Sequence, residues 1–73
     1  MQIKGTITHV EVEGGFWGIL GDDGIPYHPI EGLPKKFEKE GLRITARAKP
    51  YEGMSMFMWG RLVVLQSVKA LTD

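Results

Sequence analysis

Apolar and polar residues alternate along much of this chain, with the two-residue period that a half-buried β-strand requires. Over residues 2–13 the apolar positions are first odd, at Ile3 and Ile7, and then even, beginning at Val10. A β-bulge adds one residue to a strand and changes its phase, which lets the two halves of the strand serve differently oriented sheets. We therefore expect one long first strand over 2–13, with a bulge near Thr8-His9.

The segment 14–29 predicts a bent β-hairpin. Residues 16–21 form its first strand, and the sequence Asp22-Asp23-Gly24 is typical of a tight turn, because Asp favours turns and Gly adopts positive φ. Residues 25–28 form the next strand, and the prolines at 26 and 29 make it short or place it at a sheet edge.

The segment 33–41 predicts a helix of about two turns, since proline lies in its first turn and glycine at its end. Leu33 and Phe37 are four residues apart and form its apolar face, so we expect Phe37 to close one end of the core. Alternation then predicts a strand over 42–49. A last strand is expected over 54–68, passing through Gly60, and its two apolar faces leave its register open.

This order of three strands, a short helix and two strands resembles the oligonucleotide/oligosaccharide-binding (OB) fold, a five-stranded Greek-key barrel. The resemblance covers nearly the whole chain and rests on the order of the elements, the long kinked first strand and the place of the helix. We expect a mostly β protein with an OB-like barrel. An SH3-like barrel is the alternative, although its helix normally lies later in the chain.

Composition limits the chain to one domain, residues 1–73, with no disulfide because there is no cysteine. Nine Lys and Arg balance nine Asp and Glu. A neutral domain disfavours nucleic acid as the partner, because clustered cations supply most non-specific affinity for phosphates. No apolar run is long enough to span a membrane, and the first residues do not resemble a signal peptide, so we expect a cytoplasmic protein.

In OB folds, ligands lie across the second and third strands and against the loops that join strands one to two and four to five. The resemblance therefore implies a binding surface in this chain that draws on the hairpin and on the segment after residue 50. Its candidate side chains are Trp17, Tyr27, His28, Tyr51 and Trp59. The alternative for each aromatic ring is packing inside the barrel.

Arg43, Arg47 and Lys49 share one face of the strand 42–49 and form a candidate track for phosphates. The alternative is a solvated face that prevents edge-to-edge pairing of strands. The Met-rich segment 54–59 is a candidate homodimer interface, and its alternative is core packing.

The chain carries no recognisable catalytic or cofactor motif. The glycines at 15, 18, 21 and 24 precede a strand and two prolines, whereas a phosphate-binding loop precedes a helix. His9, His28 and the paired aspartates fit no zinc or calcium spacing, so we expect no metal and no cofactor.

Together these patterns predict a binding module without catalytic activity, which recognises a protein or a small ligand through an aromatic hairpin surface. The alternative is an OB domain that binds single-stranded nucleic acid through its aromatic residues and the stripe of Arg43, Arg47 and Lys49.

Overall fold

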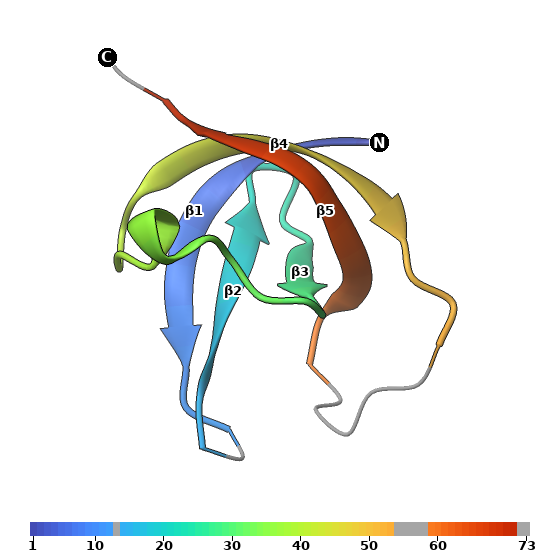
Figure 1. The fold of residues 1–73 in the computed structure, drawn as a ribbon, viewed down its shortest axis with the longest axis horizontal. Coiled ribbons are helices and arrows are strands. Elements are labelled where there is room, and N and C mark those ends of the chain that lie inside the picture. Colours follow the sequence, from blue (N-terminus) through green and yellow to red (C-terminus); the bar gives the residue numbers. More distant parts are fainter. Residues whose placement is uncertain (13, 54–58, 72–73) are drawn as a thin grey trace.

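Five β-strands close on themselves to form a barrel in the computed structural model of the chain, which describes residues 1–12, 14–53 and 59–71 (Figure 1). The order around the barrel is β1-β2-β3-β5-β4, and β4 returns to pair with β1. The strands are β1 (Gln2–Val10), β2 (Phe16–Gly21), β3 (Pro26–Pro29), β4 (Arg43–Pro50) and β5 (Arg61–Ala70). All neighbours are antiparallel except β3 and β5, which are parallel.

A single turn of 3-10 helix, η1 (Lys35–Phe37), lies between β3 and β4. Its position agrees with the OB-like order of elements, and the fold class is a mostly β, five-stranded OB-like barrel. In Figure 1 the end of β1, the start of β2 and the start of β5 lie at one end of the barrel, and the start of β1 and the end of β5 lie at the other.

The core is built from alternate residues of the strands, as the apolar pattern predicts. Ile7, Ile19, Ile44 and Val63 are fully buried. The other buried apolar residues are Ile3, Tyr27, Phe37, Ala46 and Ala48. With no cysteine, this packing and the ring of strand pairing hold the barrel together.

The β-bulge expected in the first strand is absent. The pairing of β1 with β2 runs without a shift from Gly5 opposite Gly21 to Val10 opposite Phe16. Instead β1 bends where it changes partners, since it pairs with β4 only as far as Thr6. A Cβ at Gly5 would collide with the carbonyl oxygen of Leu20, so glycine permits the close approach of β2 at this bend.

Among the described strand pairs, a register shift occurs between β4 and β5. Arg47 is opposite Ser67 and Ala48 is opposite Leu65, so Gln66 is the extra residue. A bulge of this kind increases strand twist and helps a short sheet to close.

The predicted two-turn helix over 33–41 is also wrong, because the chain leaves helical geometry after Phe37. Gly41 has positive φ, as expected of a helix cap, but its N–H donates to the carbonyl of Ile7 in β1. The Glu40 carboxylate accepts from the backbone N–H of His9. These bonds to β1 hold the end of the segment in a turn, in which the Leu42 N–H donates to the Lys39 carbonyl. A helix of two turns is too short to persist by itself against such contacts.

The last strand begins at Arg61, so the expected strand through Gly60 is wrong at that point. Gly60 has a φ of +72°, which does not fit an extended strand. The remainder of the proposed interface strand, residues 54–58, lies outside the described residues.

Candidate functional site: the outer face of β2 and β3

The alternation of β2 decides which aromatic side chains reach the surface. Ile19 is fully buried and Trp17 packs against the core, so these two residues face the barrel interior. Phe16, Gly18 and Leu20 therefore face outward. Leu20 is 47% exposed, which is unusual for a large apolar residue in the middle of a sheet.

The pairing of β3 with β2 carries this alternation across to the next strand. Tyr27 is opposite Ile19 and is only 3% exposed, so it points into the core. His28, the next residue, then faces outward beside Phe16, and their rings stack with centroids 4.1 Å apart. His28 is nevertheless buried, at 4% exposure.

Trp59 completes this surface from the connection between β4 and β5. Its ring meets Phe16 edge to face at 5.5 Å. A Cβ at Gly18 would be 2.5 Å from Trp59 ring atoms, so the indole rests on bare backbone of β2. We call Phe16, His28 and Trp59 the outer aromatic cluster. It lies on the face of strands two and three that OB folds use for ligands.

The chemistry of the cluster is apolar and neutral. Burial lowers the pKa of His28 from its ordinary value, so the imidazole is uncharged at neutral pH. Phe16 and Trp59 are partly exposed and offer aromatic surface on the side of β2 that also carries Leu20. Such a surface can stack on planar apolar groups or accept an apolar side chain.

Tyr27 is not available as a surface stacking residue, which corrects its place in the expected site. Its hydroxyl donates to Asp23 Oδ2 at 2.8 Å, and the same carboxylate accepts from the N–H of Ile25. Burial raises the pKa of Tyr27, and the bond to Asp23 adds to this. The residue connects the barrel core to the β2–β3 turn, where Gly24 has the positive φ that such a turn requires.

Trp17 likewise faces the inner side of the hairpin and is only partly exposed. Its ring meets His9 edge to face at 4.9 Å. The backbone N–H of His9 donates to Glu40 at 2.8 Å, and this bond is the largest cause of the lowered pKa of Glu40. Trp17 therefore supports the contact between the β1–β2 hairpin and the segment before β4, away from the outer aromatic cluster.

Arg43 is engaged in an ion pair, so it does not extend a free track of cations. Its two terminal nitrogens donate to the two carboxylate oxygens of Asp22, at 2.5 Å and 2.7 Å. This bond lowers the pKa of Asp22. The pair connects the β2–β3 turn to β4. The hydroxyl oxygen of Thr6, on the outer side of β1 between them, also accepts a hydrogen bond from Arg43.

Arg47 and Tyr51 are exposed and lie outside the cluster. Arg47 has no ion-pair partner within residues 1–12, 14–53 and 59–71. Tyr51 is 38% exposed, and its ring lies over Gly53. No ring contact within those ranges joins Tyr51 to Phe16 or Trp59.

Phe16 is missing from the aromatic residues selected from the sequence. The alternation along β2 did indicate that Phe16 faces outward, because Phe16, Gly18 and Leu20 share a parity opposite to that of Ile19. The contact between Gly18 and Trp59 could not be predicted from the sequence, since the two residues are 41 positions apart in the chain.

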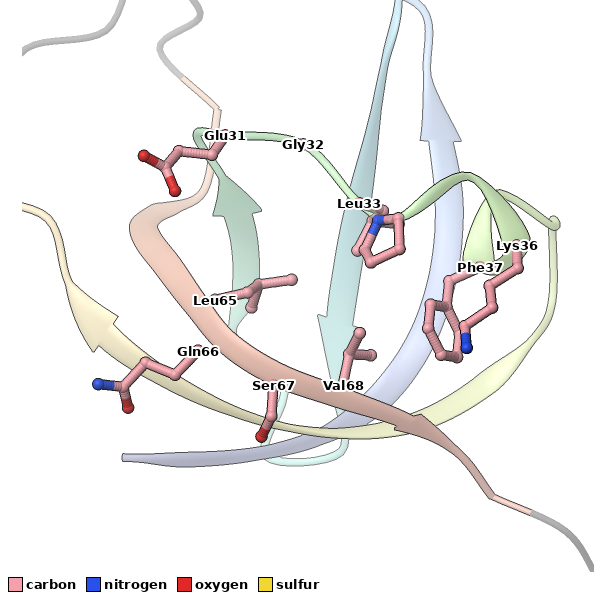
Figure 2. A pocket seen from close by; sticks show the side chains of 10 residues that line it. Glu31, Gly32, Leu33, Lys36, Phe37, Leu65, Gln66, Ser67 and Val68 are labelled. Carbon is pink, nitrogen blue, oxygen red and sulfur yellow. The ribbon is translucent and has the colours of Figure 1, made fainter.

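A hollow lies between residues 31–37 and β5, with a volume of about 710 Å³ (Figure 2). Leu33, Phe37, Leu65 and Val68 give it apolar walls. Figure 2 shows Leu65 and Val68 directed toward the segment that carries Phe37, while Gln66 and Glu31 point away. All four apolar residues belong to the core or pack against it, so this hollow is the flank of the barrel core.

Comparison with protein-family models, with curated proteins and with solved structures yields no match. No helix in the described part of the chain is long and apolar enough to cross a membrane. Within the same part, no group of three or more metal-ligating side chains is close enough to hold an ion. The barrel topology and the geometry of its faces are therefore the basis for any functional conclusion.

Proposed function

We propose that this chain is a binding module without catalytic activity, which recognises a protein or a small ligand through the outer face of β2 and β3. The observation that carries the proposal is the outer aromatic cluster together with the exposed Leu20 on the same face of β2. A strand with one side in the core normally presents polar residues on its other side, whereas β2 presents Phe16, Gly18 and Leu20. Apolar groups gathered on a surface mark interaction sites more often than they serve stability.

The ligand expected for this face is uncharged and contains a planar or apolar group. Phe16 and Trp59 supply aromatic area at a small cost in conformational entropy, and the neutral imidazole of His28 lies beneath Phe16 without adding charge. The cytoplasmic location expected from the sequence belongs to the same proposal, and the absence of cysteine agrees with it.

The experiment is a ¹⁵N-¹H NMR screen of the intact chain against a collection of small aromatic compounds. We expect amide shifts to concentrate on Phe16, Gly18, Leu20 and His28. The variant Leu20→Asn should weaken binding about tenfold while leaving the fold intact, because this side chain is exposed. Glu31→Gln, in the hollow between residues 31–37 and β5, is the control and should bind as the unmodified chain does.

Two results would overturn the proposal. One is a set of shifts that concentrates on Leu33, Phe37 and Val68 and leaves β2 unchanged. The other is binding that Leu20→Asn does not weaken.

Single-stranded nucleic acid is the second candidate ligand, and one observation favours it. Six of the nine Lys and Arg residues lie in β1, β4 and β5, and these strands contain no Asp or Glu. The six are Lys4, Arg43, Arg47, Lys49, Arg61 and Lys69. Charge is therefore segregated even though the net charge is zero. Fluorescence anisotropy of an end-labelled oligo-dT strand, titrated with the chain, should show saturable binding that weakens steeply with salt. The absence of any response up to roughly 50 µM would eliminate this candidate.

Self-association through residues 54–59 stays a prediction. Light scattering at a low and a high protein concentration tests it, and a monomer at both would contradict it.

A further inference from the structure

The outer face of β1, β4 and β5 forms a cationic surface distinct from the aromatic face. The three strands are neighbours in the order β1-β4-β5. Acidic residues occur only in the connections and at the C-terminus of the chain. Any anion near the middle of this face therefore meets no carboxylate from the strands beneath it.

Strand register brings polar side chains of the three strands into two adjacent rows. Gln2, Arg47 and Ser67 form one row, because Arg47 of β4 pairs with the other two residues. Lys4, Thr45 and Lys69 form the next row. These side chains face outward, since Ile3, Ile44 and Ala46 between them are core residues. Neighbours in a row have Cβ atoms about 5 Å apart, within reach of one small ligand.

A hollow of about 400 Å³ lies over these rows. Its walls are Gln2, Thr45, Arg47, Ser67 and Lys69, with Ala46 between them. The side-chain amide of Gln2 donates to the Thr45 oxygen at 3.2 Å, which leaves the Thr45 hydroxyl proton for another acceptor. The Ser67 hydroxyl is a further donor on the exposed surface.

The two cations in this hollow are not used elsewhere in the described structure. Arg43 is held by Asp22, and Lys4 lies close enough to Asp22 to stabilise its charge. Arg47 and Lys69 have no ion-pair partner among the residues described. They remain available to an anion from solution.

We propose that this hollow binds a phosphate-type oxyanion, with Arg47 and Lys69 as its charged contacts and Thr45 and Ser67 as hydroxyl donors. The planar guanidinium of Arg47 can donate two parallel bonds to two phosphate oxygens, while the Lys69 ammonium supplies a second positive charge. Hydroxyl groups complete the coordination of the remaining oxygens. The site is independent of the function proposed for β2 and β3, because it shares no residue with the outer aromatic cluster.

The test is an NMR titration of the intact chain with inorganic phosphate at constant ionic strength, balanced with chloride. We expect saturable shifts at the amides of Thr45, Arg47 and Ser67. Arg47→Gln and Lys69→Gln should each weaken binding about tenfold, because each removes a charge-assisted contact. Both residues are exposed, so both variants should fold.

Lys35→Gln is the matched control, since it removes the same charge from the exposed surface of η1. It should leave the phosphate affinity unchanged, and so should Leu20→Asn on the aromatic face. Equal weakening by Lys35→Gln would show a diffuse charge effect and overturn the proposal. Shifts without saturation, or shifts away from β4 and β5, would overturn it too.

Two further arms identify the source of the phosphate group. Thymidine monophosphate and an oligo-dT strand are titrated at equal phosphate concentration. Tighter binding of the oligomer that Arg47→Gln weakens assigns the site to a nucleic-acid backbone. Equal affinities per phosphate assign it to a single phosphate or its monoester.

Discussion

Gly18 and Trp59 are in contact on the outside of the barrel, and a Cβ at Gly18 would stand 2.5 Å from the indole ring. A bare position in β2 thus lets Trp59, which precedes β5, reach the face of β2 and β3. The same contact places Trp59 against Phe16 and forms the outer aromatic cluster. In OB folds the β4–β5 connection borders the ligand face, and in this chain Trp59 of the connection packs on β2.

Gly18→Ala should displace the Trp59 ring. The added methyl group would also lie 3.3 Å from Val10, so it has no free space on either side. We expect a loss of about 1 to 3 kcal/mol in the free energy of unfolding and a shift of Trp59 emission to longer wavelength. The measurement uses a Trp17→Phe background, so that Trp59 is the only tryptophan, and that background alone is the control. Unchanged emission would contradict the contact.

Tyr27→Phe should cost about 1 kcal/mol at neutral pH, because it removes the hydroxyl that donates to Asp23 and keeps the buried ring. The folded chain holds the pKa of Tyr27 above its ordinary value of 10.0. The protonated hydroxyl therefore stabilises the fold fully below pH 10, and this contribution is lost as the pH rises through the folded pKa.

Urea denaturation at pH 7 and at several pH values above 10 tests this expectation. The stabilities of the unmodified chain and Tyr27→Phe should converge as the pH rises. A difference that stays constant across this range would show that the hydroxyl does not titrate as inferred.

Asp22→Asn should lower stability at neutral pH by breaking the paired bonds to Arg43. The pKa of Asp22 lies below its ordinary value of 3.8 in the folded chain, chiefly because of the Arg43 bond. The stabilisation is therefore complete above that value and is lost as the pH falls through the lower folded pKa.

A double-mutant cycle with Arg43→Gln, followed by thermal unfolding between pH 2 and pH 7, measures this pair. Its coupling should shrink with added salt, since both side chains are about half exposed. Coupling that added salt does not reduce would rule out an ionic origin.

Phe37→Ala should cost about 3 to 5 kcal/mol, because Phe37 is buried and belongs to the core cluster. For a chain of 73 residues this is a large part of the total stability. Phe37→Leu retains most of the volume and should lose less. Urea unfolding of both variants tests the ranking, and an unchanged midpoint for Phe37→Ala would refute the core role of this residue.

Local patterns were sufficient for most of the fold. Alternation and turn residues predicted β2 at its observed limits and β4 to within one residue at each end. The chemistry of Asp22-Asp23-Gly24 predicted the turn, because tight turns need those residue types wherever they occur. The order of the elements then identified the OB-like barrel.

The errors arose where distant residues determine the backbone. The helix after β3 stops at Phe37 because Gly41 and Glu40 bond to β1. The apolar residues at even positions near the end of β1 mark no bulge. The β1–β2 register is unshifted, so Val10 faces outward beside Gly18, while Val12 lies beyond the strand and is 40% exposed. The local sequence indicates neither of these arrangements.

The sequence by itself determined the class of fold, since apolar periodicity and turn chemistry act over a few residues. Only the tertiary structure decided which side of the hairpin is exposed: Tyr27 and Trp17 turn inward, and Phe16 joins Trp59 and His28 outside. It also decided that Arg43 is paired with Asp22, whereas Arg47 lines an open hollow. The physical reason is that burial and ion pairing depend on partners from other strands, which closure of the barrel brings together.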